Sequence, residues 1–199
     1  VTHLPGLIDF RALRTHFVLA PPRSAGPLRI GCVGRLSAEK NQALLLQAVA
    51  ALDAPGSLEV WLIGGGGDRA TLQALTTQLG IGASVRFLGE TTDMARIYAE
   101  LDALAVPSTW EGQCRVAAEA QSLGLTVLVS PGVPDFALLP NPPARRIAGW
   151  AVADWAAALA SLIDDPPPRR LPDAVEVDAS GVALEAGVSR LCEILEAAA

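Results

Sequence analysis

Two basic residues lie close together directly after the first apolar run of the chain. Arg35 follows Gly34, and Lys40 lies five residues beyond Arg35. A glycine lets a ligand approach the backbone, and the helix expected after Lys40 has an electropositive N-terminus, so this segment has the chemistry to bind a diphosphate. The alternative is a surface Arg35 and a Lys40 paired with its neighbour Glu39. Spacing alone favours neither, although Lys40 is the only lysine among 15 basic residues.

Two carboxylates eight positions apart, Glu111 and Glu119, form a second candidate site. Glu111 lies in the loop before a predicted helix and Glu119 about one turn inside it, so both are expected to face the same cleft. A carboxylate can accept two hydrogen bonds from the vicinal diol of a sugar. The amides of Gly112, Gln113 and Cys114 would lie at the helix N-terminus, ready for phosphate or hydroxyl oxygens. Capping is the alternative role for Glu111, whereas Glu119 has apolar neighbours and needs a partner for its charge.

Four consecutive glycines, Gly64 to Gly67, follow the second apolar run. The dinucleotide fingerprint G-x-G-x-x-G would require a glycine at position 69, where the chain has Arg69. We therefore predict a tight turn close to a ligand. A nicotinamide-dependent oxidoreductase remains an alternative, with the missing third glycine against it.

Short apolar runs alternate with segments of helical periodicity, as in βαβ units. We therefore predict an α/β fold, a single Rossmann-like doubly wound parallel sheet with helices on both faces. Ligands of such sheets bind at the carboxyl ends of the strands, where the candidate residues lie. The expected strands are 28–34, 58–63, 85–88, 103–106 and 126–129, and the expected helices are 42–52, 69–79, 94–101, 114–123 and 155–163.

Composition indicates how the chain is organised. Turn-forming residues predict a linker over 1–27, the α/β domain occupies 28–165, and 166–199 is an extension with a closing amphipathic helix at 182–195. With 51% apolar and 18% charged residues, the domain is large enough to bury its own core. Because the chain begins with Val1 rather than Met, we expect it to be part of a longer protein.

Charge and cysteine content exclude several classes of function. A net charge of −6 goes against a nucleic-acid partner, although a small phosphate ligand needs only one or two cations. The three cysteines are unpaired in spacing, and no leader-like or membrane-spanning apolar run is present. We expect a cytoplasmic protein without a metal site, in which any membrane contact would come from a part that this chain lacks.

Five segments, taken in order, resemble the motifs of glycosyltransferase family 4, in the C-terminal domain of its GT-B fold. One has the pattern G-R-L-x-x-x-K, and another matches the E-x7-E signature of the family. The resemblance extends from about Leu4 to Pro166. The segments are 33–41, 62–66, 85–89, 106–124 and 127–130.

The resemblance implies a donor-binding role for these residues. Arg35 and Lys40 would hold the donor diphosphate, with Gly34 and Gly64 close by, and Leu88 ends a strand that lies against the nucleobase. It also implies a retaining transfer of a hexose from a UDP- or GDP-linked sugar, without a separate cofactor. The cations would stabilise the leaving phosphate, which makes them catalytic candidates.

The carboxylates and amides of the second site receive roles in the same way. Glu111, the third catalytic candidate, would bind hexose hydroxyls, and Glu119 would bind the ribose diol. Gly112, Gln113 and Cys114 would line the donor site. The acceptor, such as a polysaccharide or glycolipid, belongs to an N-terminal half that this chain lacks, so the chain alone is expected to be inactive. Its two histidines, at positions 3 and 16, lie in the leading segment, and no base is assigned.

The chain departs from the family pattern at three places. Gln113 and Cys114 replace a Phe-Gly or similar small pair, the donor-loop motif at 131–135 ends in the shorter acid Asp135, and 141–146 replaces another motif. Hexose selection is therefore open. A degenerate GT-B domain that binds a partner protein without catalysis is the alternative from a different class, and a related GT-B enzyme such as a nucleotide-sugar epimerase matches less well.

Overall fold

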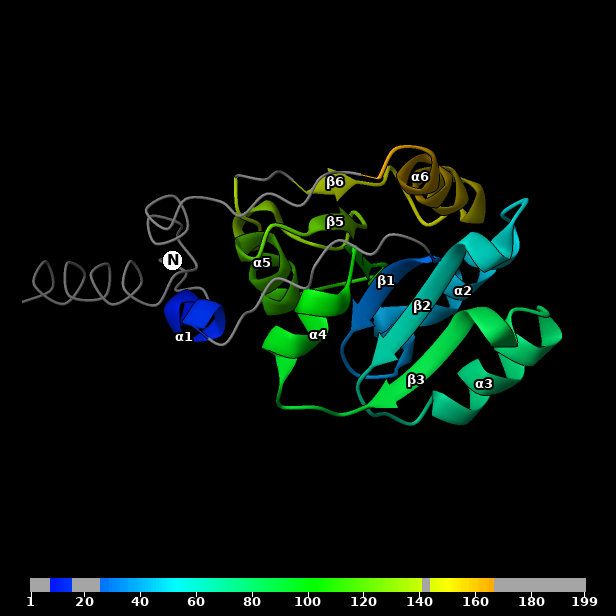
Figure 1. Cartoon of the computed structure of the whole chain (residues 1–199), viewed down its shortest axis with the longest axis horizontal. Helices are drawn as coiled ribbons and strands as arrows, with labels where there is room; N and C mark the ends of the chain where they lie inside the picture. The colour runs from blue at the N-terminus through cyan, green and yellow to red at the C-terminus, as the bar shows by residue number, and fades with distance from the viewer. Residues whose placement is uncertain (1–7, 16–25, 141–143, 167–199) are drawn as a thin grey trace, which may run out of the picture.

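In the computed structural model, residues 8–15, 26–140 and 144–166 are described. Their centre is a six-stranded sheet in the order β3-β2-β1-β4-β5-β6 (Figure 1). Every neighbouring pair of strands is parallel, which confirms the predicted doubly wound sheet. The strands are β1 (Leu28–Val33), β2 (Leu58–Ile63), β3 (Val85–Gly89), β4 (Ala103–Val106), β5 (Thr126–Val129) and β6 (Arg145–Arg146).

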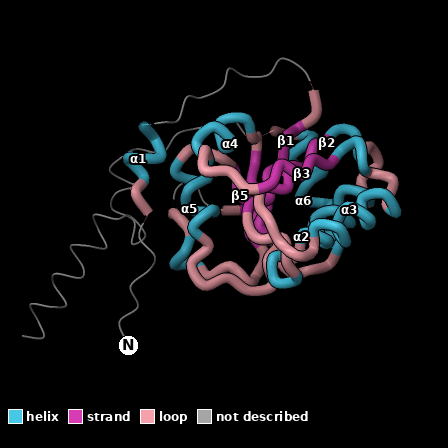
Figure 2. Tube along the Cα trace, turned by 90° about the horizontal axis from the view of Figure 1, so that it is seen from below, coloured by secondary structure: helices cyan, strands magenta, loops and turns pink. Residues whose placement is uncertain are grey.

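Helices cover both faces of this sheet, as Figure 2 shows. On the first face, Leu45, Leu72 and Trp155 share one apolar cluster with strand side chains. On the second face, Tyr98 and Ala117 belong to another cluster. The helices are α2 (Gln42–Ala50), α3 (Arg69–Gln78) and α6 (Val152–Asp164) on the first face, and α4 (Met94–Glu100) and α5 (Arg115–Ser122) on the second. Four short 3₁₀ helices complete the connections: Ala38–Lys40, Pro55–Ser57, Gly82–Ser84 and Asp135–Ala137.

Because both faces are covered, the strands are apolar along their length. All six residues of β2 and all four of β4 are buried, as parallel strands require. The five predicted strands and the five predicted helices between 28 and 165 are all present, with ends that move by up to three residues. The sequence pattern therefore predicted the frame of the domain.

Besides the short 3₁₀ helices, one α-helix and one strand in the described part of the chain were not predicted. Helix α1 (Phe10–Thr15) lies within the segment expected to be a linker, and Ile8 and Phe10 are buried against Ala118 and Leu139. Strand β6 pairs with β5 through Leu128 and Val129. The predicted helix at 182–195 and both histidines lie outside the described residues, as does Leu4, where the resemblance begins.

The turns after β1 and β2 are held together by backbone contacts. The amide of Gly34 donates to the carbonyl of Ile63 at 2.9 Å, and that of Leu36 to Gly65 at 2.7 Å. Gly64 has a φ of 138° and packs directly on the carbonyl of Gly34, where a Cβ would collide. Glycine is therefore required at this position by geometry and by space. No helix in the described part of the chain is long and apolar enough to cross a membrane.

Candidate functional site

A cleft of about 890 Å³ lies at the carboxyl ends of β1, β2 and β3. Three of the predicted site residues, Gly34, Arg35 and Gly64, line it. The guanidinium of Arg35 is exposed and makes no hydrogen bond or ion pair with the residues that the structure describes. The remaining lining residues are Val33, Ile63, Gly65, Gly66, Glu90, Thr91, Thr92 and Met94.

The segment from Glu90 to Met94 was not singled out from the sequence, although it directly follows a predicted strand. Its place after β3 could have identified it, because loops at the carboxyl ends of parallel strands share one edge. Leu88, predicted to lie against a nucleobase, is 41% exposed. It belongs to the same edge but is not among the residues that line the cleft.

Lys40 lies beside this cleft and pairs with a carboxylate far away in sequence. Its Nζ is 2.6 Å from Oε1 of Glu111, with 24% of the Lys40 side chain and 8% of the Glu111 side chain exposed. The aliphatic part of Lys40 passes next to Gly34. The acid that pairs with Lys40 is therefore Glu111. The alternative interpretation, in which Lys40 pairs with its neighbour Glu39, is wrong.

Glu39 shapes the same loop with its backbone. The Glu39 carbonyl accepts two hydrogen bonds from Thr109, one from the backbone amide at 2.8 Å and one from the side-chain hydroxyl at 3.2 Å. These bonds connect the loop after β1 to the loop after β4. The Glu39 backbone amide and the Ser37 hydroxyl, followed by Arg35 and Lys40, hold the pKa of the exposed Glu39 carboxyl below its ordinary value. Glu39 therefore stays ionised near the two cations.

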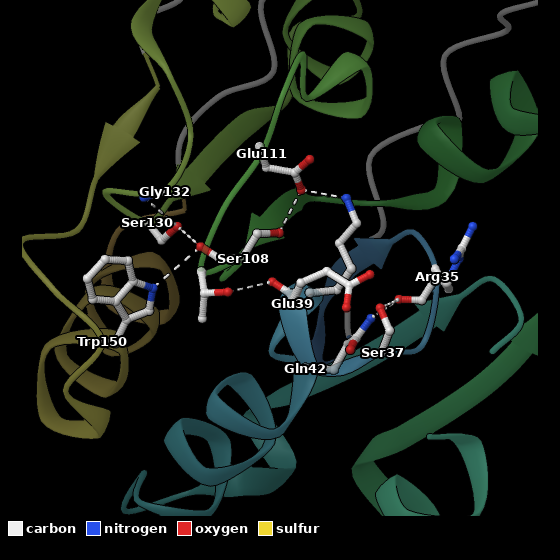
Figure 3. A network of polar contacts seen from close by, with 11 residues as sticks. Arg35, Ser37, Glu39, Gln42, Ser108, Glu111, Ser130, Gly132 and Trp150 are labelled. Atoms are coloured by element: carbon white, nitrogen blue, oxygen red, sulfur yellow. Dashed lines mark hydrogen bonds and ion pairs between the residues drawn. The ribbon is translucent and has the colours of Figure 1, made fainter. Parts of the chain in front are cut away.

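Glu111 is held by several neighbouring groups (Figure 3). The hydroxyl of Ser108 donates to its Oε1 at 2.7 Å, and its backbone amide donates to the carbonyl of Gly132 at 2.9 Å. Oε1 thus accepts from both Ser108 and Lys40, whereas Oε2 receives no donor from the described residues. The carboxylate is fixed at one oxygen and available at the other.

Glu119 lies on α5 and contacts α4. The hydroxyl of Tyr98 donates to its Oε2 at 2.9 Å, and Nη2 of Arg115 lies 3.9 Å from its Oε1. Tyr98 is fully buried. Burial, followed by the charge of Glu119, raises the pKa of Tyr98 well above its ordinary value, so its hydroxyl remains a neutral donor. This tyrosine is the partner that the partly buried carboxylate of Glu119 needs.

The loop before α5 ends in an unusual backbone conformation. Cys114 has a φ of 36° and a ψ of 50°, in the left-handed region, and is buried. Gly112 and Gln113, which precede it, are partly buried. Position 114 is one where the resemblance led us to expect a small residue, and the positive φ explains that preference. Burial, followed by the charge of Glu111, raises the pKa of Cys114 to about 12.

The structure therefore arranges the predicted residues in three groups. Gly34, Arg35 and Gly64 line the cleft, Lys40 and Glu111 form a pair against Gly34, and Glu119 is bound to α4 through Tyr98. Neither Ser108 nor Tyr98 was identified from the sequence. No group of three His, Cys, Asp or Glu residues suited to a metal ion occurs in the described ranges.

Comparison with known proteins assigns the chain to a family. The family described as Glycosyl transferases group 1 matches residues 20–172. The chain belongs to this family. This assignment agrees with the resemblance to glycosyltransferase family 4. The oxidoreductase alternative is thereby set aside.

Two similar curated proteins are D-inositol 3-phosphate glycosyltransferases. The one from Corynebacterium glutamicum (strain R) is 35% identical over 147 residues, which cover 68% of this chain and 35% of that protein. The one from Mycobacterium ulcerans (strain Agy99) is 32% identical over 166 residues, which cover 78% of this chain and 34% of that protein. The chain spans about a third of the length of these relatives.

Solved structures of GT-B glycosyltransferases share the fold. HepE of Anabaena in complex with UDP has a TM-score of 0.73 at 23% identity, over 87% of this chain and 50% of that chain. The apo form of the lipopolysaccharide outer core galactosyltransferase WaaB has a TM-score of 0.79 at 18% identity, over 100% and 56% of the two chains. The predicted Rossmann-like fold is thus confirmed.

Proposed function

We propose that this chain is the donor-binding half of a retaining glycosyltransferase that moves a hexose from a nucleotide sugar to an acceptor. The observation that carries the proposal is the cleft at the carboxyl ends of β1 to β3, lined by Arg35 and adjoined by Lys40. Its two cations come from one loop. They lie close to Gly34 and Gly64, where the absence of a side chain lets a ligand approach the backbone. Such a site suits the diphosphate of a UDP- or GDP-linked sugar.

Arg35 and Lys40 have different tasks in this proposal. The guanidinium of Arg35, which makes no ion pair with the described residues, binds the diphosphate directly. Lys40 shares its charge between Glu111 and the phosphate, because its ammonium has three donors and Glu111 takes one. Both cations stabilise the negative charge that develops as the bond between the anomeric carbon and the phosphate oxygen breaks.

Glu111 and Glu119 bind the two sugars of the donor. Oε2 of Glu111 accepts hydrogen bonds from hydroxyl groups of the hexose, and the carboxylate of Glu119 accepts hydrogen bonds from the two hydroxyl groups of the ribose. The acceptor oxygen forms its bond on the face that the phosphate leaves, and its proton passes to the departing phosphate. The donor is a substrate, and no further cofactor is needed.

The comparisons support a nucleotide-sugar donor. The structure of HepE contains UDP, and another contains UDP-glucose. Because the chain spans about a third of its curated relatives, the acceptor site belongs to a part of the enzyme outside this chain. We expect the chain alone to bind donor in the cytoplasm without completing transfer.

Isothermal titration calorimetry tests the proposal. The chain is titrated with UDP, GDP, ADP and NAD, together with the variants Lys40→Ala and Glu119→Ala. Binding of one nucleoside diphosphate, weakened about tenfold or more by each substitution, is expected. Arg86→Ala is the matched control, because it removes a cation at the amino end of β3 that pairs with Glu59. Binding of none of these nucleotides would contradict the proposal and favour the degenerate, non-catalytic domain. Binding of NAD alone would contradict the proposal in favour of a dinucleotide site.

A further inference from the structure

Each carboxylate of the Glu111 and Glu119 pair receives a hydrogen bond from one buried hydroxyl. Ser108 is 1% exposed, and its hydroxyl lies 2.7 Å from Oε1 of Glu111. Tyr98 is fully buried, and its hydroxyl lies 2.9 Å from Oε2 of Glu119. The two donors come from different elements, the loop after β4 and helix α4. In both pairs one carboxylate oxygen is held by a buried donor.

Ser108 is itself fixed by two further loops (Figure 3). Its carbonyl accepts the hydroxyl of Ser130, at the end of β5. The same carbonyl accepts the indole N–H of Trp150 at 3.4 Å. Ser130 is fully buried, so the loops after β4, β5 and β6 meet at Ser108. Its hydroxyl therefore presents a fixed donor to Glu111.

Gly132 completes this anchor. Its amide donates to the Ser130 hydroxyl at 3.2 Å, and its carbonyl accepts the amide of Glu111 at 2.9 Å. A Cβ at position 132 would lie 2.6 Å from the carbonyl oxygen of Ser108, so only glycine fits. The loop after β5 thus holds the Glu111 backbone while Ser108 holds its carboxylate.

Tyr98 plays the equivalent part for Glu119. Its hydroxyl is also 3.5 Å from the carbonyl of Val116, one turn earlier on α5. The second oxygen of Glu119 lies 3.9 Å from Arg115, beyond hydrogen-bond distance. Tyr98 therefore holds one oxygen, whereas the other forms only a long ion pair with the exposed Arg115.

We propose that Ser108 and Tyr98 are positioning residues that orient Glu111 toward the hexose and Glu119 toward the ribose of the donor. This inference rests on the proposed function. A carboxylate that accepts hydrogen bonds from a diol must keep a fixed orientation. A buried hydroxyl that donates to one of its oxygens fixes this orientation before the ligand binds. Ser108 acts on the hexose end and Tyr98 on the ribose end, so their removal has separable effects.

The test measures ratios of dissociation constants in Ser108→Ala and Tyr98→Phe, each of which deletes a single oxygen. Wild type and variants are titrated with UDP, 2′-deoxy-UDP and UDP-glucose, and with GDP, 2′-deoxy-GDP and GDP-mannose. Ser108→Ala is expected to weaken the nucleotide sugar about tenfold more than the nucleoside diphosphate. Tyr98→Phe is expected to reduce the preference for ribose over deoxyribose by about fivefold, without a further loss for the nucleotide sugar.

Controls separate orientation from general damage. Ser84→Ala removes a buried hydroxyl that donates to Pro55, at the amino end of β3, and should leave every ratio unchanged. If Ser108→Ala unfolds, Ser130→Ala replaces it, because that variant removes the donor to the Ser108 carbonyl and should shift the same ratio by a smaller factor.

The outcomes distinguish this inference from the proposed function. One outcome is that wild type binds a nucleoside diphosphate while each variant loses the same affinity for every ligand, or loses none. In that case Ser108 and Tyr98 do not position the carboxylates, and only this inference fails. If wild type binds none of the six ligands, the proposed function fails and the inference fails with it.

Discussion

The two ends of the sheet use charge in opposite ways. At the amino ends of the strands, Glu59 pairs with both Arg29 and Arg86, and Arg29 also lies 3.0 Å from Glu100. At the carboxyl ends, Arg35 has no ion pair with the described residues, and Lys40 pairs with a glutamate through one oxygen. The charges of Glu59, Arg29 and Arg86 at the first end are satisfied by the fold, whereas the charge of Arg35 at the second end is left for a ligand.

This contrast teaches where to look for function in the domain. The amino-end cluster also includes the indole of Trp61, 4.8 Å from the Arg29 guanidinium, and its carboxylate Glu59 is 7% exposed. A closed cluster of this kind stabilises the sheet. Substitutions at the two ends should therefore separate stability from ligand binding.

The largest effect is expected from Lys40→Ala. It removes a cation from the proposed diphosphate site and should weaken nucleoside diphosphate binding by about 2 to 3 kcal/mol, or about 30- to 150-fold. It also leaves Glu111 without its ion pair, so the free energy of unfolding should fall. Calorimetry and chemical denaturation measure the two losses. A loss of stability without a loss of affinity would mean that Lys40, like the charges at the amino ends of the strands, stabilises the fold and does not bind the ligand.

Glu59→Gln should give the opposite profile. The variant keeps the shape of the side chain and removes the charge shared by Arg29 and Arg86, which should lower the free energy of unfolding by about 1 to 2 kcal/mol. Donor affinity should stay the same, because no part of the cleft is altered. Denaturation in urea and titration with the best-binding diphosphate check both statements, and a weaker titration would show that the two ends are coupled.

A smaller effect is expected from Arg35→Ala. Its exposed guanidinium supports no contact in the described structure, so the melting temperature should stay unchanged. Diphosphate affinity should fall about tenfold, or 1.4 kcal/mol, because one charged contact with the ligand is lost. Thermal melting and calorimetry on the same preparation compare the two. Unchanged affinity would remove Arg35 from the site.

The smallest effect concerns the backbone at position 114. Cys114→Gly and Cys114→Ala both delete the buried thiol, but only glycine relieves the φ of 36°. The glycine variant should therefore be more stable than the alanine variant by about 1 kcal/mol. Urea denaturation of the pair measures the difference. Equal stabilities would mean that the left-handed conformation carries no strain here.

The frame of the fold could be predicted from the sequence because its strands are continuous apolar runs. Helix α1 could not, since Ile8 and Phe10 are buried against Ala118 and Leu139, more than 100 positions away in the chain. Strand β6 consists of Arg145 and Arg146 and has no apolar pattern. It exists through backbone pairing with β5.

The candidate site was predicted in part for the same reason. Arg35, Lys40, Glu111 and Glu119 stand at strand ends, which local patterns locate. Their contacts are long-range: Lys40 and Glu111 are 71 positions apart. Ser108 could have been noticed, because it lies in the same loop as Glu111. Tyr98 sits mid-helix on an apolar face, where nothing local sets it apart from a core residue.

The two arginines of β6 also bear on aggregation. This is the outermost described strand beyond β5 (Figure 1), and its backbone edge is a place where a strand of another molecule could add. Arg145 and Arg146 are both exposed, and β6 is two residues long. The charge of Arg146 is paired with Asp135, and an edge of two residues offers few hydrogen bonds to a growing sheet. The outer margin of the sheet thus protects the domain from joining edge to edge with copies of itself.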